Sequence, residues 1–164
     1  EEIMKEKHIS SNKFFISAAF VLLFALIVSI PFLSKTEKAY ADTNTYEQNL
    51  ELLARAVNGE ARGEIYEGQV AVAAVILNRV KHPSFPNTIA GVIYQPGAFT
   101  AVNDGQIHAS LDKSSTVYKA CQDALNGWDP SGGAIYYYNP AKTTNKWIYS
   151  RPVVKVLGNH TFAK

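Results

Sequence analysis

Residues 58–64 read NGEARGE and place carboxylates between and beside glycines, directly after a helical pattern. If the helix continued, Glu60, Glu64 and Glu67 would stack on one face at i, i+4 and i+7, and three like charges weaken a helix. Each glycine in its interior would cost about 1 kcal/mol relative to alanine. We therefore expect the helix to end near Gly59, with Glu60 directly beyond it.

A carboxylate in this position is suited to general acid catalysis. Glu60 would lie beside the last unpaired carbonyls of the helix, at the negative end of the helix dipole. The apolar segment that starts at Gly68 would exclude water nearby. Both effects favour the protonated acid near neutral pH, which a general acid requires. The alternative is a solvated surface charge paired with Arg62, and the local sequence leaves both interpretations open.

One acid is enough for one class of glycan cleavage. Hydrolysis of a glycosidic bond normally uses two carboxylates. A lytic transglycosylase needs one, which protonates the leaving oxygen and then takes the proton of the sugar's own 6-hydroxyl as an anhydro ring closes. The other acids beyond residue 68 fall in or near loops or on an outer helix face: Asp104, Asp112, Asp123 and Asp129.

The elements that must position these groups follow from hydrophobic periodicity and turn residues. Helices are expected over 45–57, 68–80, 87–94 and 114–125, and a brief strand over 98–102. The segment GQVAVAAVILNRV is apolar on nearly every side, which predicts a helix buried in the centre of the domain. The tail is aromatic and β-branched, with Gly158-Asn159 as a tight hairpin turn. The predicted class is α+β: a mostly helical domain with a small C-terminal antiparallel sheet.

The N-terminal segment has the pattern of an export signal. Lysines precede an apolar run over 14–33, and an Ala-Tyr-Ala exit follows at 39–41. We expect a signal peptide over 1–41 and one catalytic domain over 42–164, although an uncleaved membrane anchor is an alternative. Either places the domain outside the cytoplasm. Cys121 is the only cysteine, lies in an apolar helical pattern and is expected to be a buried, inert thiol.

The charge pattern argues against nucleic acid as a partner. The formal net charge is +2, and no run or stripe of Lys and Arg is present. No metal site is expected, because no HExxH pattern occurs and scattered histidines are weak evidence. No cofactor is expected. The membrane is expected as a partner only through the N-terminal segment, if it is uncleaved.

Several motifs in the same order resemble bacterial cell wall hydrolases of the spore cortex-lytic (SleB/CwlJ-like) type. The stretches are LLARAVNGEARGEIYEGQVAVAAVILNRV, FPNTIAGVIYQPGAFTAV, YYYNP and KWIYSRPVVKVLGNHTFAK. The resemblance covers about Leu50 to the C-terminus. It implies a lysozyme-like fold with a small added sheet, peptidoglycan glycan strands as partner, and lytic transglycosylase activity between muramic acid and glucosamine units. The family's catalytic glutamate, the first acid of GEARGE, falls on Glu60.

The resemblance also implies which residues contact the glycan. The candidate substrate-binding residues are Thr100, Tyr137, Tyr138, Asn139, Trp147 and Glu64. Aromatic faces suit sugar rings and amides suit acetamido groups, but strand alternation allows only one side of IYYYN to face a groove. His160 is expected to be a structural hydrogen-bonding residue, and Phe99 a core residue.

Three other functions stay open. The first is a hydrolysing muramidase with Glu60 as acid and a water activated elsewhere. The second is a metal-dependent amidase or peptidase that uses Glu60, His108 and His160. The third is a glycan-binding module without catalysis, in which exposed aromatic residues serve binding alone. Each would act on the cell wall or spore cortex.

Overall fold

A helix that covers residues 43–61 leads into the domain. The computed structural model describes residues 43–164, so the predicted signal segment over 1–41 lies outside the described residues. The helix ends at Ala61, close to the expected end near Gly59, but it includes Glu60, which was expected to lie directly beyond it. Glu60 nevertheless lies in the last turn of the helix.

Close packing explains why glycine occurs inside this helix. The helix α4 (Thr100–Asn103) crosses next to Gly59, and a Cβ atom there would lie 2.5 Å from Cβ of Ala101. Such a separation is shorter than van der Waals contact allows. The glycine therefore permits two helices to approach each other and does not terminate the first one.

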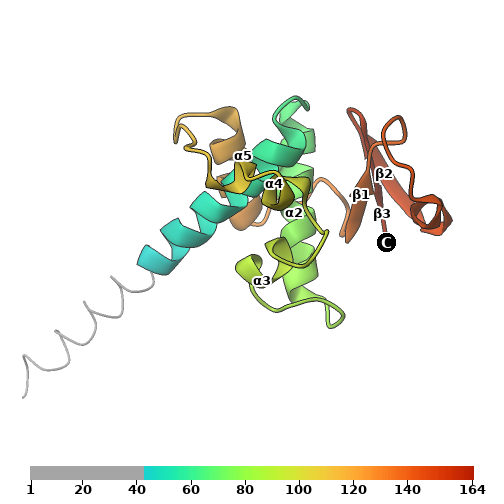
Figure 1. Cartoon of the computed structure of the whole chain (residues 1–164), viewed down its shortest axis with the longest axis horizontal. Coiled ribbons are helices and arrows are strands. Elements are labelled where there is room, and N and C mark those ends of the chain that lie inside the picture. Colours follow the sequence, from blue (N-terminus) through green and yellow to red (C-terminus); the bar gives the residue numbers. More distant parts are fainter. Residues whose placement is uncertain (1–42) are drawn as a thin grey trace, which may run out of the picture. The chain divides into compact units, whose positions relative to one another are not determined.

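The apolar segment forms the central helix α2 (Tyr66–Lys81), as predicted. Nine consecutive residues, 68–76, are buried, so the helix is covered on every side along this stretch. Figure 1 shows α2 at the centre of the domain, with α5 (Thr116–Leu125) and α3 (Ile89–Ile93) against it. The caps are local: the Ser115 hydroxyl accepts from the Tyr118 N–H, and the Thr88 hydroxyl from the Gly91 N–H.

The strand expected over 98–102 is wrong. Phe99 is extended and buried in the core as predicted, and the chain then turns into the single-turn helix α4. The backbone N–H groups of Thr100 and Ala101 donate to the carboxylate of Glu60 and not to a neighbouring strand. The 3₁₀ turn η1 (Gln106–His108) follows.

The tail forms a three-stranded antiparallel sheet. The strands β1 (Tyr136–Tyr138), β2 (Val153–Leu157) and β3 (His160–Ala163) lie in the order β1-β3-β2. Leu157 pairs with His160, so the turn between β2 and β3 consists of Gly158 and Asn159, as predicted. Gly158 has φ +55°, the left-handed conformation such turns require.

The segment before β2 forms the 3₁₀ helix η2 (Lys146–Ser150). Cys121 is fully buried, and burial raises the pKa of its thiol, in agreement with an inert cysteine. The predicted mixed class, mostly helical with a small C-terminal antiparallel sheet, is confirmed. Within residues 43–164, no helix combines the length and apolarity that crossing a bilayer demands.

Candidate active site

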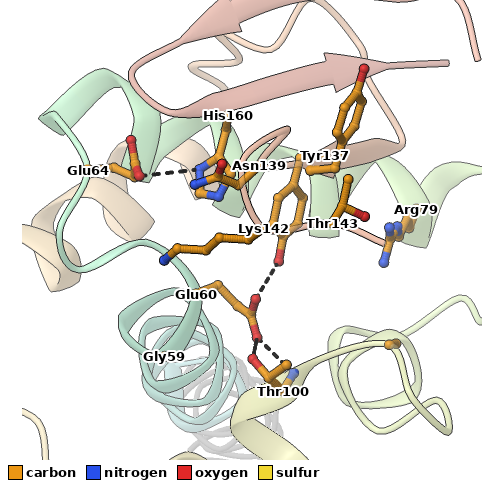
Figure 2. Close-up of a pocket in the computed structure, with 12 residues that line it drawn as sticks. Gly59, Glu60, Glu64, Arg79, Thr100, Tyr137, Asn139, Lys142, Thr143 and His160 are labelled. Carbon is orange, nitrogen blue, oxygen red and sulfur yellow. Dashed lines mark hydrogen bonds and ion pairs between the residues drawn. The ribbon is translucent and has the colours of Figure 1, made fainter. Parts of the chain in front are cut away.

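Glu60 lies in a cavity of about 490 Å³ between the end of the first helix, α4 and the sheet. Figure 2 shows its carboxylate directed toward side chains from two other elements. The cavity is lined by Gly59, Glu60, Glu64, Arg79, Ala98, Thr100, Tyr137, Tyr138, Asn139, Lys142, Thr143 and His160. The residues come from segments up to about one hundred positions apart, so only the folded chain brings them together.

One oxygen of Glu60 is held by α4. Oε1 accepts hydrogen bonds from the Thr100 N–H at 2.9 Å, the Thr100 hydroxyl at 2.7 Å and the Ala101 N–H at 3.4 Å. The side chain therefore has a fixed direction, because three donors from the same turn converge on one atom. Arg62, the alternative partner for Glu60, instead donates to Oε1 of Gln106 at 2.7 Å.

The other oxygen faces the sheet. The hydroxyl of Tyr137 in β1 donates to Oε2 of Glu60 at 3.2 Å. Burial, with a further contribution from the negative charge of Glu60, raises the pKa of Tyr137 well above its usual value. The phenol is therefore protonated near neutral pH and acts as a donor. Its ring packs edge-on against His160, with centroids 5.3 Å apart.

Glu64 connects the NGEARGE segment to the β2–β3 turn. Its carboxylate accepts from the Asn159 N–H at 2.9 Å and from the Asn159 amide at 3.1 Å. A Cβ atom at Gly158 would collide with the same carboxylate. Partial burial opposes ionisation, but the hydrogen bonds from Asn159 outweigh it and lower the pKa of Glu64. Glu64 is thus an ionised anchor for the hairpin.

His160 is buried beside this anchor. Its Nδ1 lies 3.9 Å from Oε1 of Glu64 and has no hydrogen-bond partner. Burial lowers the pKa of His160, although the charges of Glu64 and Glu60 act in the opposite direction. The imidazole is therefore neutral near pH 7. Its burial agrees with a structural role, but its buried Nδ1 makes no hydrogen bond, so the predicted hydrogen-bonding part of that role is not supported; the residue also lines the cavity.

The structure brings most of the candidate residues together. Thr100, Tyr137, Tyr138, Asn139 and Glu64 line the cavity with Glu60. Trp147 does not line it: 51% of the residue is exposed, and its indole packs against Tyr136 and Arg151.

Sequence reasoning missed several lining residues. Lys142 and Thr143 directly follow the YYYNP segment, and that proximity was a usable signal. Arg79 has no such signal, because in sequence it reads as an ordinary basic residue in the last turn of a helix.

Comparisons with known proteins identify the family of the chain. A family of proteins described as cell wall hydrolases matches residues 63–163. The chain belongs to the cell wall hydrolase family. It is 60% identical over 122 residues to a spore cortex-lytic enzyme of Bacillus cereus, a match that covers 74% of this chain and 46% of the relative. The cell wall hydrolase CwlJ of Bacillus subtilis is 29% identical over 121 residues, which cover 70% of this chain and 83% of CwlJ.

Solved structures of this family share the fold. The catalytic domain of the Bacillus cereus SleB protein matches with a TM-score of 0.68 and 58% identity, covering 72% of this chain and 91% of that domain. The catalytic domain of the germination-specific lytic transglycosylase SleB from Bacillus anthracis gives the same TM-score and identity, over 71% of this chain and 93% of that domain.

These matches confirm the family predicted from the motifs and the enzyme class, a cell wall hydrolase domain. The chain spans less than half the length of the spore cortex-lytic enzymes it matches. Among the residues described, no three His, Cys, Asp or Glu side chains are grouped so that they could hold a metal ion.

Proposed function

We propose that this cell wall hydrolase domain is a lytic transglycosylase that cuts peptidoglycan between N-acetylmuramic acid and N-acetylglucosamine, with Glu60 as the single acid and base. One observation carries the proposal: Glu60 lies in the cavity with Oε1 held by Thr100 and Ala101, while Oε2 is approached by the Tyr137 hydroxyl. An acid with one fixed oxygen and one reactive oxygen has the orientation that directed proton transfer requires.

In the first step, Glu60 donates its proton to the oxygen of the glycosidic bond. The bond between that oxygen and C1 of the muramic acid breaks, its electron pair stays with the departing sugar, and positive charge develops at C1. Glu60 becomes a carboxylate in this step. The hydrogen-bond donors of Thr100, Ala101 and Tyr137 stabilise the negative charge of the Glu60 carboxylate as it forms.

In the second step, the same carboxylate acts as a base. It takes the proton of the 6-hydroxyl of the muramic acid, and the oxygen of that hydroxyl bonds to C1. The product is a 1,6-anhydro ring, and Glu60 regains its proton. No water is consumed, so the step needs no second carboxylate.

The contacts of Glu64, the second acid in the cavity, support transglycosylation over hydrolysis. Both oxygens of Glu64 accept hydrogen bonds from Asn159, so the side chain serves the hairpin and is not directed at an attacking water. Asp123 and Asp129 are likewise engaged, the first by the Tyr66 hydroxyl and the second by Ser131 and Asn78. The description of the Bacillus anthracis relative as a lytic transglycosylase also supports it.

The proposal assigns the remaining candidates to glycan binding. Tyr138 and Asn139, at the end of β1, would contact sugar rings and acetamido groups inside the cavity. Trp147 lies outside the cavity with an exposed indole. It would therefore contact the part of the glycan strand that extends beyond the cleavage site. Action on the cell wall or spore cortex, outside the cytoplasm, is part of the same proposal and is supported by the names of the relatives.

Glu60→Gln tests the proposal, with Glu67→Gln as a matched control. Glutamine keeps the size and polarity of the side chain but supplies no acid. Glu67 pairs with Lys155 and does not line the cavity. We expect Glu60→Gln to abolish release of fragments from purified sacculi and spore cortex, with folding intact, and Glu67→Gln to remain active.

Mass spectrometry of the released fragments identifies the reaction. An anhydro end is lighter by one water than a reducing end. Release of fragments with reducing ends would show that the reaction is hydrolysis by a muramidase and not lytic transglycosylation. Full activity of Glu60→Gln would remove the assignment of Glu60 altogether.

A further inference from the structure

Arg79 places a fixed positive charge in the cavity wall without an acid beside it. It lies in the last turn of α2, is partly buried and lines the same cavity as Glu60. No carboxylate of residues 43–164 forms an ion pair with it. Charged groups removed from water are normally paired, because burial of a lone charge is costly.

The guanidinium is held in one orientation by its surroundings. Its Nε–H donates to the carbonyl of Ile135 at 2.7 Å. Its central carbon lies 5.3 Å from the ring centroid of Phe85, 5.7 Å from that of Phe99 and 5.8 Å from that of Tyr136. These rings stabilise the cation in part. They also fix its plane, so little side-chain freedom is left to lose when a ligand binds.

The two terminal nitrogens of Arg79 remain available. Nη1 and Nη2 make no hydrogen bond to any residue that the structure describes, and neither is buried without a partner. Burial lowers the pKa of the guanidinium, but an arginine stays charged at neutral pH. A rigid charged fork with two free nitrogens matches a carboxylate, which can accept both hydrogen bonds at once.

Lys142, the second cation that lines the cavity, is not held in a fixed orientation as Arg79 is. Lys142 is exposed, and its charge acts on Glu64 and His160. In the view of Figure 2, Arg79 and the ammonium group of Lys142 lie on opposite sides of the Tyr137–Glu60 hydrogen bond. Only Arg79 combines fixed geometry with unpaired donors.

We propose that Arg79 is a specificity-determining residue that binds a carboxylate carried by the substrate, and this rests on the proposed peptidoglycan function. The muramic acid unit carries a lactyl group that ends in a carboxylate when it bears no peptide. When a peptide is attached, that carboxyl is an amide and the charges lie on the peptide. Arg79 therefore distinguishes acidic from neutral substituents on the sugar next to the cleaved bond.

Binding measured without turnover tests the inference. Three ligands that hold no bond between two sugars are titrated into the full chain: N-acetylmuramic acid, its lactyl methylamide, and N-acetylmuramoyl-L-alanyl-D-glutamate. Nuclear magnetic resonance of ¹⁵N-labelled arginine side chains follows the Nη groups of Arg79 directly. A hydrogen bond to a charged group contributes enough to predict an affinity about tenfold higher for the acid than for the methylamide.

Arg79→Lys and Arg151→Lys form a matched pair. Arg151 also donates its Nε–H to a backbone oxygen, that of Lys164, and stacks on Tyr136 and Trp147, but it does not line the cavity. We expect Arg79→Lys to remove the preference for the acid and Arg151→Lys to retain it. If Arg79→Lys does not fold, the arginine resonances of the unmodified chain decide the question.

The outcomes separate this inference from the proposed function. If the free acid binds more tightly than both other ligands, the lactyl carboxylate is the group bound. If the peptide ligand binds as tightly as the free acid, and both bind more tightly than the methylamide, Arg79 also binds carboxylates of the peptide. Equal affinity for all three ligands, or a preference that survives Arg79→Lys in a folded protein, overturns the inference. Because no bond is cleaved in the assay, the result is independent of whether Glu60→Gln abolishes turnover.

Discussion

The hydroxyl of Tyr137 lies 3.2 Å from Oε2 of Glu60, although the two residues are 77 positions apart in the chain. This contact joins the end of the first helix to the first strand of the sheet. Because α4 holds the other oxygen, the acid is fixed only when the helix, the short α4 turn and the sheet are all in place. The small sheet is therefore part of the framework that holds Glu60, the proposed catalytic acid, and not an appendage to a helical domain.

Tyr137→Phe removes the hydroxyl and keeps the ring, which packs against His160 and Phe162. We expect kcat to fall about fivefold to tenfold, the loss of roughly one hydrogen bond to the carboxylate that forms in the first step. Thermal unfolding should change little. Turnover of muropeptides from sacculi measures the effect. Tyr149→Phe is the control, because its hydroxyl donates to the carbonyl of Pro140 outside the cavity; equal rates for the two variants would contradict the assigned role of Tyr137.

Thr100→Val removes the hydroxyl that donates to Oε1 of Glu60 and keeps the backbone N–H that donates to the same atom. We expect a reduction of about fivefold in kcat, since one donor of three is lost. Thr100→Ser restores the hydroxyl and should restore most of the activity. A serine variant as slow as the valine variant would show that the methyl group, and not the hydrogen bond, matters.

Gly59→Ala tests the close approach of the first helix to α4. The added Cβ would lie 2.5 Å from Cβ of Ala101, so α4 must move and Thr100 with it. We expect an unfolding free energy lower by about 1–3 kcal/mol, as for overpacked sites. Activity should fall about tenfold or more, because small displacements of catalytic groups are costly.

Gly63→Ala is the matched control from the same motif. A Cβ atom at Gly63 meets nothing within 4 Å, and its φ is not in the left-handed region. Stability should change by about 0.5 kcal/mol or less, and activity should be retained. If Gly59→Ala behaves like this control in thermal unfolding and in turnover, the packing explanation for the glycine is incorrect.

The stability of the domain should fall as the pH falls, through two groups in succession. Burial lowers the pKa of His160 from 6.5, so below that pH the unfolded chain binds a proton that the folded chain resists. The pKa of Glu64 is lowered from 4.5, so the stability it contributes is present above that pH and is lost as the pH falls further. Both groups therefore make the unfolded state bind more protons in acid.

Thermal unfolding between pH 8 and about pH 3.5 measures this dependence. Glu64→Gln should be less stable than the unmodified chain at neutral pH, because it loses the charged acceptor for Asn159, and its melting temperature should fall less steeply below about pH 4.5. If the melting temperature of Glu64→Gln falls with pH below about 4.5 as steeply as that of the unmodified chain, Glu64 does not titrate as proposed.

The sequence by itself determined the main elements and the acid that they carry. The continuous apolar run over 68–80 has only one stable environment, the centre of a helical domain, and it became α2. The Gly158-Asn159 pair fixed the β2–β3 turn, since such a turn needs a left-handed residue. Glu60 was predicted to be the catalytic acid from its place near a helix end, and the motif order predicted the family that the comparisons confirm.

Only the tertiary structure decided the contacts that give these elements a function. Gly59 reads locally as a helix stop, but the requirement it meets is space for Ala101, which lies 42 positions away in the chain. The segment at 98–102 reads as a strand, but its N–H groups bind the carboxylate of Glu60. Arg79 became a candidate site because three aromatic rings and a distant carbonyl fix its guanidinium. Local patterns record backbone preference and burial, whereas such contacts depend on which distant surfaces meet when the chain folds.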